Sequence, residues 1–122
     1  MRAMRIDFYD DPLEAPRSRE EVRIRRLSAQ VYPDGRRVAI TFDLTPFLER
    51  PSLAVTLTNA QGEAAGSMTV IETLDRHFSL TLHIRDKDPA GTYRLDTFLY
   101  YNSPETGKVI VDSQTTTFNI EK

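Results

Sequence analysis

Apolar and polar residues alternate with a period of two along most of this chain, and the longer period of an amphipathic helix is missing. Residues 38–44 (VAITFDL), for example, place Val38, Ile40 and Phe42 on one face and Thr41 on the other. Seven runs of this kind predict seven strands: 21–32, 38–44, 53–59, 64–72, 77–84, 92–101 and 109–120. We expect each strand to have one buried face and one face in water.

Turn-forming residues separate these runs, as in YPDGR (32–36), NAQGE (59–63) and SPETGK (103–108). Short strands with a turn every 8 to 12 residues are typical of a β-sandwich. The sequence therefore predicts an all-β fold, a single antiparallel β-sandwich of about seven strands. Residues 45–51 (TPFLERP) predict one helical turn that crosses between the sheets, because a proline follows the capping threonine and a second proline ends the turn.

Two runs depart from strict alternation. Ile24 and Leu27 differ by an odd number of residues, which predicts a bulge near Arg25 and Arg26. The run at 64–72 is weakened by alanine and glycine, which is typical of an edge strand.

The first 20 residues form a separate N-terminal extension, and residues 21–122 form the sandwich domain. Met4, Ile6 and Phe8 alternate with polar residues and predict a short strand at residues 4–9. This strand either pairs with its own domain or completes the sheet of another copy. Both alternatives are open at this point.

Composition narrows the function classes. The 122 residues suit one core, and the absence of cysteine removes disulfides and thiolate chemistry. The net charge of −2 and the charged N-terminal residues predict a cytoplasmic protein that binds neither nucleic acid nor membrane. One hairpin is locally basic, with Arg23, Arg25, Arg26, Arg36 and Arg37. We expect these arginines to pair with neighbouring carboxylates.

Candidate catalytic and metal-binding residues are few. Asp86 and Asp88 have the spacing of a calcium loop, but Lys87 lies between them. His77 and His83 are six positions apart on one predicted strand, which places them about 20 Å apart, too far to share a metal ion. No nucleophile elbow, phosphate-binding loop or dinucleotide fingerprint is present. We therefore expect no enzyme activity and no cofactor.

The stretch DPAGTYRL (88–95) resembles the corner between the E and F strands of immunoglobulin-like and fibronectin type III-like domains of bacterial type. The resemblance implies that Asp88, Gly91 and Tyr93 form this corner, with the tyrosine hydroxyl bonded to the backbone. One extra residue separates Asp88 from Tyr93, and the C strand lacks its tryptophan. The resemblance covers residues 22 to 120 as a fold pattern and implies no particular activity.

The resemblance also predicts a partner surface. With Tyr93 facing inward, Phe98 and Tyr100 face outward on the F strand beside Arg94, and Thr56 lies next to them on the C strand. We hypothesise a non-catalytic module that binds a protein partner, or itself as a homodimer, through the outer face of the C–F–G sheet. The alternatives are an oligomer exchanged through residues 4–9, and a β-sandwich that binds a small ligand or carbohydrate.

Overall fold

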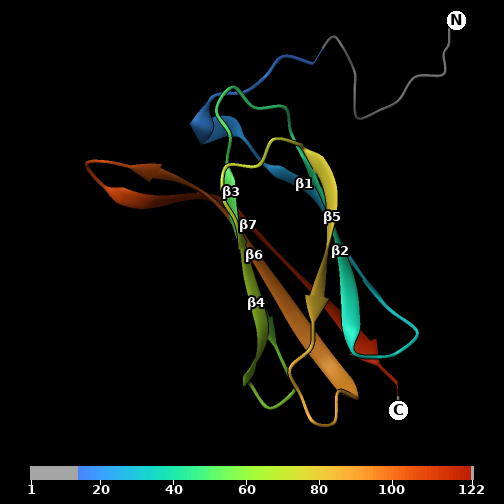
Figure 1. Ribbon diagram of the computed structural model, residues 1–122. Coiled ribbons are helices and arrows are strands. Elements are labelled where there is room, and N and C mark those ends of the chain that lie inside the picture. The colour runs from blue at the N-terminus through green and yellow to red at the C-terminus, as the bar shows by residue number, and fades with distance from the viewer. Residues whose placement is uncertain (1–13, 122) are drawn as a thin grey trace, which may run out of the picture.

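The computed structural model describes residues 14–121, and these form two antiparallel sheets that pack face to face (Figure 1). The described part contains a 3₁₀ turn and seven strands: η2 (Arg19–Glu21), β1 (Ile24–Val31), β2 (Arg37–Leu44), β3 (Ser52–Thr58), β4 (Ala64–Val70), β5 (His77–His83), β6 (Gly91–Ser103) and β7 (Gly107–Ile120). One sheet has the order β1-β2-β5 and the other the order β4-β3-β6-β7. The predicted all-β sandwich of seven strands is confirmed.

The core lies between the sheets and is built from the alternate residues that the pattern predicted. Val38, Ile40 and Phe42 from β2 are fully buried, and Leu95 and Leu99 from β6 meet them from the other sheet. Phe42 also stacks on Phe78 of β5, with 4.9 Å between the ring centroids. Both sheets therefore bury one face, and this burial holds them together.

Local irregularities follow the sequence closely. The β1–β2 register shifts between Ile24 and Arg26, so the predicted bulge is confirmed. β4 lies at the edge of its sheet, as its alanine and glycine content indicated. A second register shift, between Leu99 and Tyr100, leaves Val111 of β7 without a directly opposite residue on β6.

The predicted helical turn at residues 45–51 is wrong. The segment does cross between the sheets, but its backbone pairs with the chain before η2 instead of with itself. Arg17 N–H donates to the Pro46 carbonyl and Leu48 N–H donates to the Arg17 carbonyl, both at 3.0 Å. These bonds form an isolated parallel bridge between Arg17 and Phe47, and a distant partner has replaced the local helical bonds.

The two sheets are also joined along their sides. The Asp112 side chain of β7 accepts a 2.8 Å hydrogen bond from Ile24 N–H, and the Gln114 amide donates to the Ile24 carbonyl. On the opposite side, Arg85 N–H donates to the Ala65 carbonyl of β4 at 2.8 Å. Part of each edge is therefore occupied by the other sheet.

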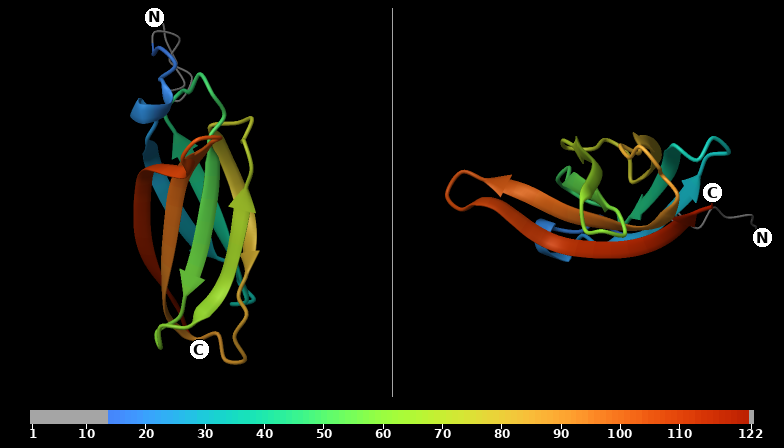
Figure 2. Two further views of the ribbon diagram at one scale, coloured as in Figure 1. Left: turned by 90° about the vertical axis from the view of Figure 1, so that its left-hand side faces the viewer. Right: turned by 90° about the horizontal axis from the view of Figure 1, so that it is seen from below.

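β6 and β7 are about twice as long as the other strands, with 13 and 14 residues against seven or eight. Their hairpin runs past the sandwich and projects from it, as both views of Figure 2 show. We call residues 100–110 of this hairpin the arm. It leaves the body at the end that also carries the loops 45–51 and 71–76 (Figure 1).

The strand predicted at residues 4–9 lies outside the described residues. In the part of the chain that is described, no helix is long and apolar enough to cross a membrane.

Candidate functional site

The predicted corner forms, with a different acid at its centre. The Tyr93 hydroxyl lies 2.8 Å from the Pro89 carbonyl and 2.8 Å from the Asp86 carboxylate, and these two acceptors share its single hydrogen. Asp88 instead accepts a 3.4 Å hydrogen bond from Ala90 N–H, within the turn. Gly91 has φ +125°, a conformation that glycine adopts most readily.

Tyr93 is buried at this corner. Its burial, followed by the hydrogen bond to Asp86, raises the pKa of the hydroxyl far above its usual range. The Asp86 carboxylate also accepts a hydrogen bond from the Asn59 amide at 3.4 Å, so its hydrogen bonds lie within the corner. Within residues 14–121 no group of three metal-ligating side chains forms, at this loop or elsewhere. The corner therefore orients the start of β6.

The predicted aromatic shelf on the outer face of β3 and β6 is only partly present. Phe98 is half-buried and lies opposite Ala54, and Arg94 is exposed opposite Thr58. Tyr100, however, is only 3% exposed. The prediction that Tyr100 is an exposed anchor is wrong.

The bulge beside Tyr100 explains this burial in part. A bulge bends and twists its hairpin, and the amine of Lys108 lies over the Tyr100 ring at 4.5 Å from its centroid. The rest of the outer face is mainly hydroxyl-bearing: Thr56, Thr58, Ser67, Thr69, Ser113, Thr115 and Thr117. This face presents a polar surface to solvent.

Several of the arginines and one of the histidines named from the sequence have partners within the chain. Arg37 pairs with Asp34 at 2.8 Å, and Arg25 pairs with Glu14. His77 Nδ1 lies 2.8 Å from the Asp43 carboxylate on the neighbouring strand, while His83 is exposed at the other end of β5. Two arginines of the basic hairpin therefore form ion pairs with carboxylates, as we expected from the sequence.

The arm carries apolar side chains on both of its faces. Val109 pairs with Tyr101 and Ile110 pairs with Tyr100, so the two aliphatic side chains point in opposite directions. Val109 is 40% exposed and Ile110 is 53% exposed. In the body, each strand covers its apolar face with the other sheet, but within residues 14–121 no second sheet lies against the tip of the arm.

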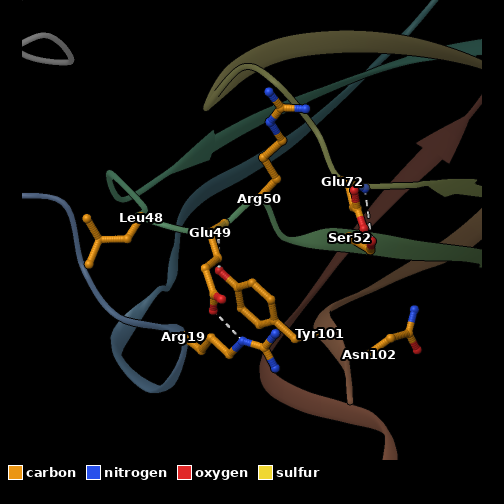
Figure 3. Close-up of a pocket in the computed structure, with 8 residues that line it drawn as sticks. All are labelled: Arg19, Leu48, Glu49, Arg50, Ser52, Glu72, Tyr101 and Asn102. Atoms are coloured by element: carbon orange, nitrogen blue, oxygen red, sulfur yellow. Dashed lines mark hydrogen bonds and ion pairs between the residues drawn. The ribbon is translucent and has the colours of Figure 1, made fainter. Parts of the chain in front are cut away.

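A hollow of about 410 Å³ lies where the arm leaves the body (Figure 3). We call it the elbow; it is lined by Arg19, Leu48, Glu49, Arg50, Ser52, Glu72, Tyr101 and Asn102. Its base is a buried tyrosine. The Tyr101 hydroxyl donates a 2.8 Å hydrogen bond to the Glu49 carbonyl, and the Arg19 guanidinium lies 5.1 Å from the centre of the ring.

Charge reinforces the elbow. Arg19 forms an ion pair with Glu49, and this hydrogen bond raises the pKa of the arginine. Burial raises the pKa of the Tyr101 hydroxyl to about 12, and the Glu49 carboxylate contributes in the same direction. Figure 3 shows Arg19 and Glu49 meeting beside the tyrosine ring, while Arg50 points away from them. The root of the arm is thus fastened to η2 and to the loop 45–51.

Exposed aliphatic residues gather on the two loops beside the elbow. Leu48 is 69% exposed, Ile71 is 63% exposed and Leu74 is 71% exposed. We call these three residues the loop end. Thr73 N–H donates to the Pro51 carbonyl at 2.9 Å, so the two loops are held side by side.

The loop 71–76 has a strained backbone at its centre. Glu72 has φ +47°, which is uncommon for a residue with a side chain. Its N–H donates to the Ser52 hydroxyl at 3.0 Å, a bond that holds this conformation. Strain of this kind persists where the surroundings fix it and is frequent at functional sites.

Neither the arm nor the elbow was predicted from the sequence. The elbow unites residues that are up to 83 positions apart, Arg19 and Asn102, and no local motif marks it. One feature of the sequence indicated the arm: the runs 92–101 and 109–120 are longer than the seven-residue run of β3, with which β6 pairs.

No protein-family model and no curated protein matches the chain. Among solved structures, it is similar to a β-glucuronidase from Bifidobacterium dentium, with a TM-score of 0.61 and 16% identity. It is also similar to a glycosyl hydrolase family 2 member from Bacteroides cellulosilyticus, with a TM-score of 0.55 and 9% identity. A third similar structure is a β-glucuronidase from Ruminococcus gnavus, with a TM-score of 0.52 and 14% identity.

These similarities concern one part of much larger proteins. The matches cover 81%, 81% and 82% of this chain, but only 18%, 15% and 16% of the three neighbours. At these identities the likeness shows the fold alone. The chain is a β-sandwich of the kind that occurs as one domain within these glycoside hydrolases.

Proposed function

We propose that this chain is a non-catalytic accessory domain that binds another protein through its arm and loop end. The exposure of Val109 and Ile110 on opposite faces of a projecting hairpin carries the proposal. A two-stranded hairpin has little stability of its own in water. One that displays aliphatic residues on both faces is suited to insertion between surfaces of a partner.

The surroundings of the arm support the same role. The loop end adds three exposed aliphatic residues at the same end of the molecule (Figure 1). Charged residues such as Arg50 and Glu72 border them around the elbow. An apolar centre with a polar rim is the usual composition of a protein interface.

The proposed surface differs from the one that the sequence indicated. The outer face of β3, β6 and β7 keeps Phe98 half-buried and Tyr100 covered, and is otherwise rich in threonine. Burial of exposed apolar side chains is the main favourable contribution to most protein–protein association, so such side chains serve as anchors. The arm has such anchors exposed and the outer face does not.

Paired variants test this proposal. Val109→Asp/Ile110→Asp places charge on both faces of the arm, and Thr56→Asp/Thr69→Asp places the same charge on the outer face. With each protein immobilised against an extract of its native cell, we expect the wild type and the outer-face variant to retain one defined protein. We expect the arm variant to lose it. Retention by the arm variant and loss by the outer-face variant would contradict the proposal.

A carbohydrate-binding role is the second candidate, favoured by the glycoside hydrolases among the structural neighbours. The Ruminococcus gnavus enzyme has been solved with D-glucuronic acid, although its TM-score here is only slightly above 0.5. In this chain the elbow is the candidate pocket, with Arg50 and Asn102 as polar contacts. Its one aromatic ring, Tyr101, is buried and is not available for stacking on a sugar.

Thermal unfolding with a panel of sugars distinguishes the two roles. A ligand at about 100 times its dissociation constant adds about 2.7 kcal/mol to the free energy of unfolding. If the elbow binds a sugar, D-glucuronic acid or a related sugar will raise the melting temperature of the wild type and not that of Arg50→Ala. If no sugar in the panel changes the melting temperature, protein binding remains as the single candidate role.

A further inference from the structure

We propose that two copies of this chain associate through the free edge of β7, so that their four-stranded sheets join into one sheet of eight strands. This inference is independent of the arm and its partner. It rests on the second half of β7, residues 115–120.

β7 is the outermost strand of its sheet, so one side of its backbone has no strand partner among residues 14–121. The side chains of Asp112 and Gln114 bind Ile24 and cover the edge there, and the side chain of Ile120 lies against Gly35 in the turn between β1 and β2. Beyond Gln114, no hydrogen bond from another strand to this edge is present within the described residues. Unpaired N–H and C=O groups in such a row are a template for another strand.

This edge lacks the features that normally prevent such pairing. From Ser113 to Ile120 the sequence SQTTTFNI contains no charge and no proline. The residues are mostly β-branched or aromatic, which favours the extended conformation. Charges, prolines and bulges are the means by which edge strands avoid each other, and here the bulge and both charges, Lys108 and Asp112, lie in the other half of β7.

The other three edges are better protected. β1 presents adjacent arginines, Arg25 and Arg26, at its bulge. β5 begins and ends with histidine. β4 is uncharged, but its Ala65 carbonyl already accepts from Arg85, and a side chain at Gly66 would lie 3.1 Å from the His83 carbonyl.

A second copy fits this edge because an uncharged strand is complementary to itself. Two β7 strands related by a two-fold axis run antiparallel, and only the residue on the axis faces its own counterpart. Centred on Thr117, the pairing places Thr115 opposite Asn119 and Thr116 opposite Phe118, with no like charges opposed. Threonine and aromatic cross-strand pairs of this kind are favourable.

The pairing also positions the arms. The arm and the C-terminal end of β7 lie at opposite ends of the strand (Figure 2). Antiparallel association therefore directs the two arms to opposite ends of the joined sheet, and each remains open to a partner.

Charge placed on the edge tests the contact. Thr117 and Asn119 are exposed, so Thr117→Lys/Asn119→Lys opposes like charges across the two-fold axis. Because the contact is one short strand pair, we expect self-association of the full chain in the micromolar range, measured by analytical ultracentrifugation. The lysine variant should associate at least about tenfold more weakly. The matched control, Ser67→Lys/Thr69→Lys on β4, should associate as the wild type does.

A charge exchange makes the test specific. Thr117→Glu/Asn119→Glu should also be monomeric by itself, and an equimolar mixture of the glutamate and lysine variants should form the heterodimer. Circular dichroism should show every variant folded, and the glutamate variant, which places an acid opposite Arg94, serves if the lysine variant fails to fold. Hydrogen exchange of the wild type should slow at residues 115–119 as the concentration rises.

Other outcomes would overturn the inference. A wild type that stays monomeric at several hundred micromolar excludes it, and so does a mixture of variants that fails to associate. Concentration-dependent protection at residues 108–111 instead would place the contact in the arm. Association that is lost in Ile6→Asp/Phe8→Asp but kept in both β7 variants would assign it to strand exchange by residues 4–9.

Discussion

β6 and β7 run through two environments, and the body and the arm differ although the same two strands build both. In the body, Leu95 and Leu99 are fully buried by the opposite sheet. In the arm, the opposite sheet has ended, and Val109 and Ile110 are left exposed. Strand pairing therefore continues where core packing stops.

The largest contrast is expected in stability. Leu95→Ala removes a fully buried side chain from the body and should lower the free energy of unfolding by about 2–5 kcal/mol. Ile110→Ala in the arm should lower it by less than about 1 kcal/mol, because half of that side chain is already in water. Urea unfolding measures both. Similar losses for the two variants would mean that the arm packs as tightly as the body.

A smaller contrast is expected between two tyrosines of β6. Tyr93→Phe leaves the Pro89 carbonyl and Asp86 without their shared donor and should cost about 1–3 kcal/mol. Tyr101→Phe removes one hydrogen bond, to the Glu49 carbonyl, and should cost about 0.5–1.5 kcal/mol. Urea unfolding at neutral pH gives both values. If Tyr101→Phe costs more, the elbow and not the corner fixes the path of β6.

The smallest effect concerns alkaline pH. Folding raises the pKa of Tyr101 to about 12, whereas a tyrosine in the unfolded chain titrates near ~10. The unfolded state therefore loses its proton first, so this stabilisation is complete below pH ~10 and declines as the pH rises toward 12. Unfolding measured between about pH 9 and 11 should show a shallower decline in stability for Tyr101→Phe than for the wild type. An identical slope would mean that the hydroxyl titrates normally.

Local sequence was sufficient for much of the body. The alternation in 38–44 predicted which β2 residues are buried, because side chains in a strand point to opposite faces in turn. The odd spacing of Ile24 and Leu27 located the bulge, and the DPAGTYRL stretch located the corner. Each of these features depends on residues that are neighbours in the chain.

The candidate site was harder to predict because it depends on distant residues. Alternation predicted Tyr100 on the outer face, but this residue is only 3% exposed, in part because the amine of Lys108 lies over its ring. The acid that binds Tyr93 is Asp86 and not Asp88, since the path of the turn decides which carboxylate reaches the hydroxyl. Two backbone hydrogen bonds with Arg17, one donated by it and one accepted by it, replaced the helical turn predicted at residues 45–51.

The sequence by itself determined the strands, their buried faces and the corner, because backbone geometry and side-chain alternation act over a few residues. Only the tertiary structure decided which part of β6 and β7 has a sheet beneath it, which aromatic residues are covered, and which edge remains free. Those properties depend on where each sheet ends relative to the other. The relative ends of the two sheets depend on segments that are far apart in the chain, so no local sequence pattern predicts them.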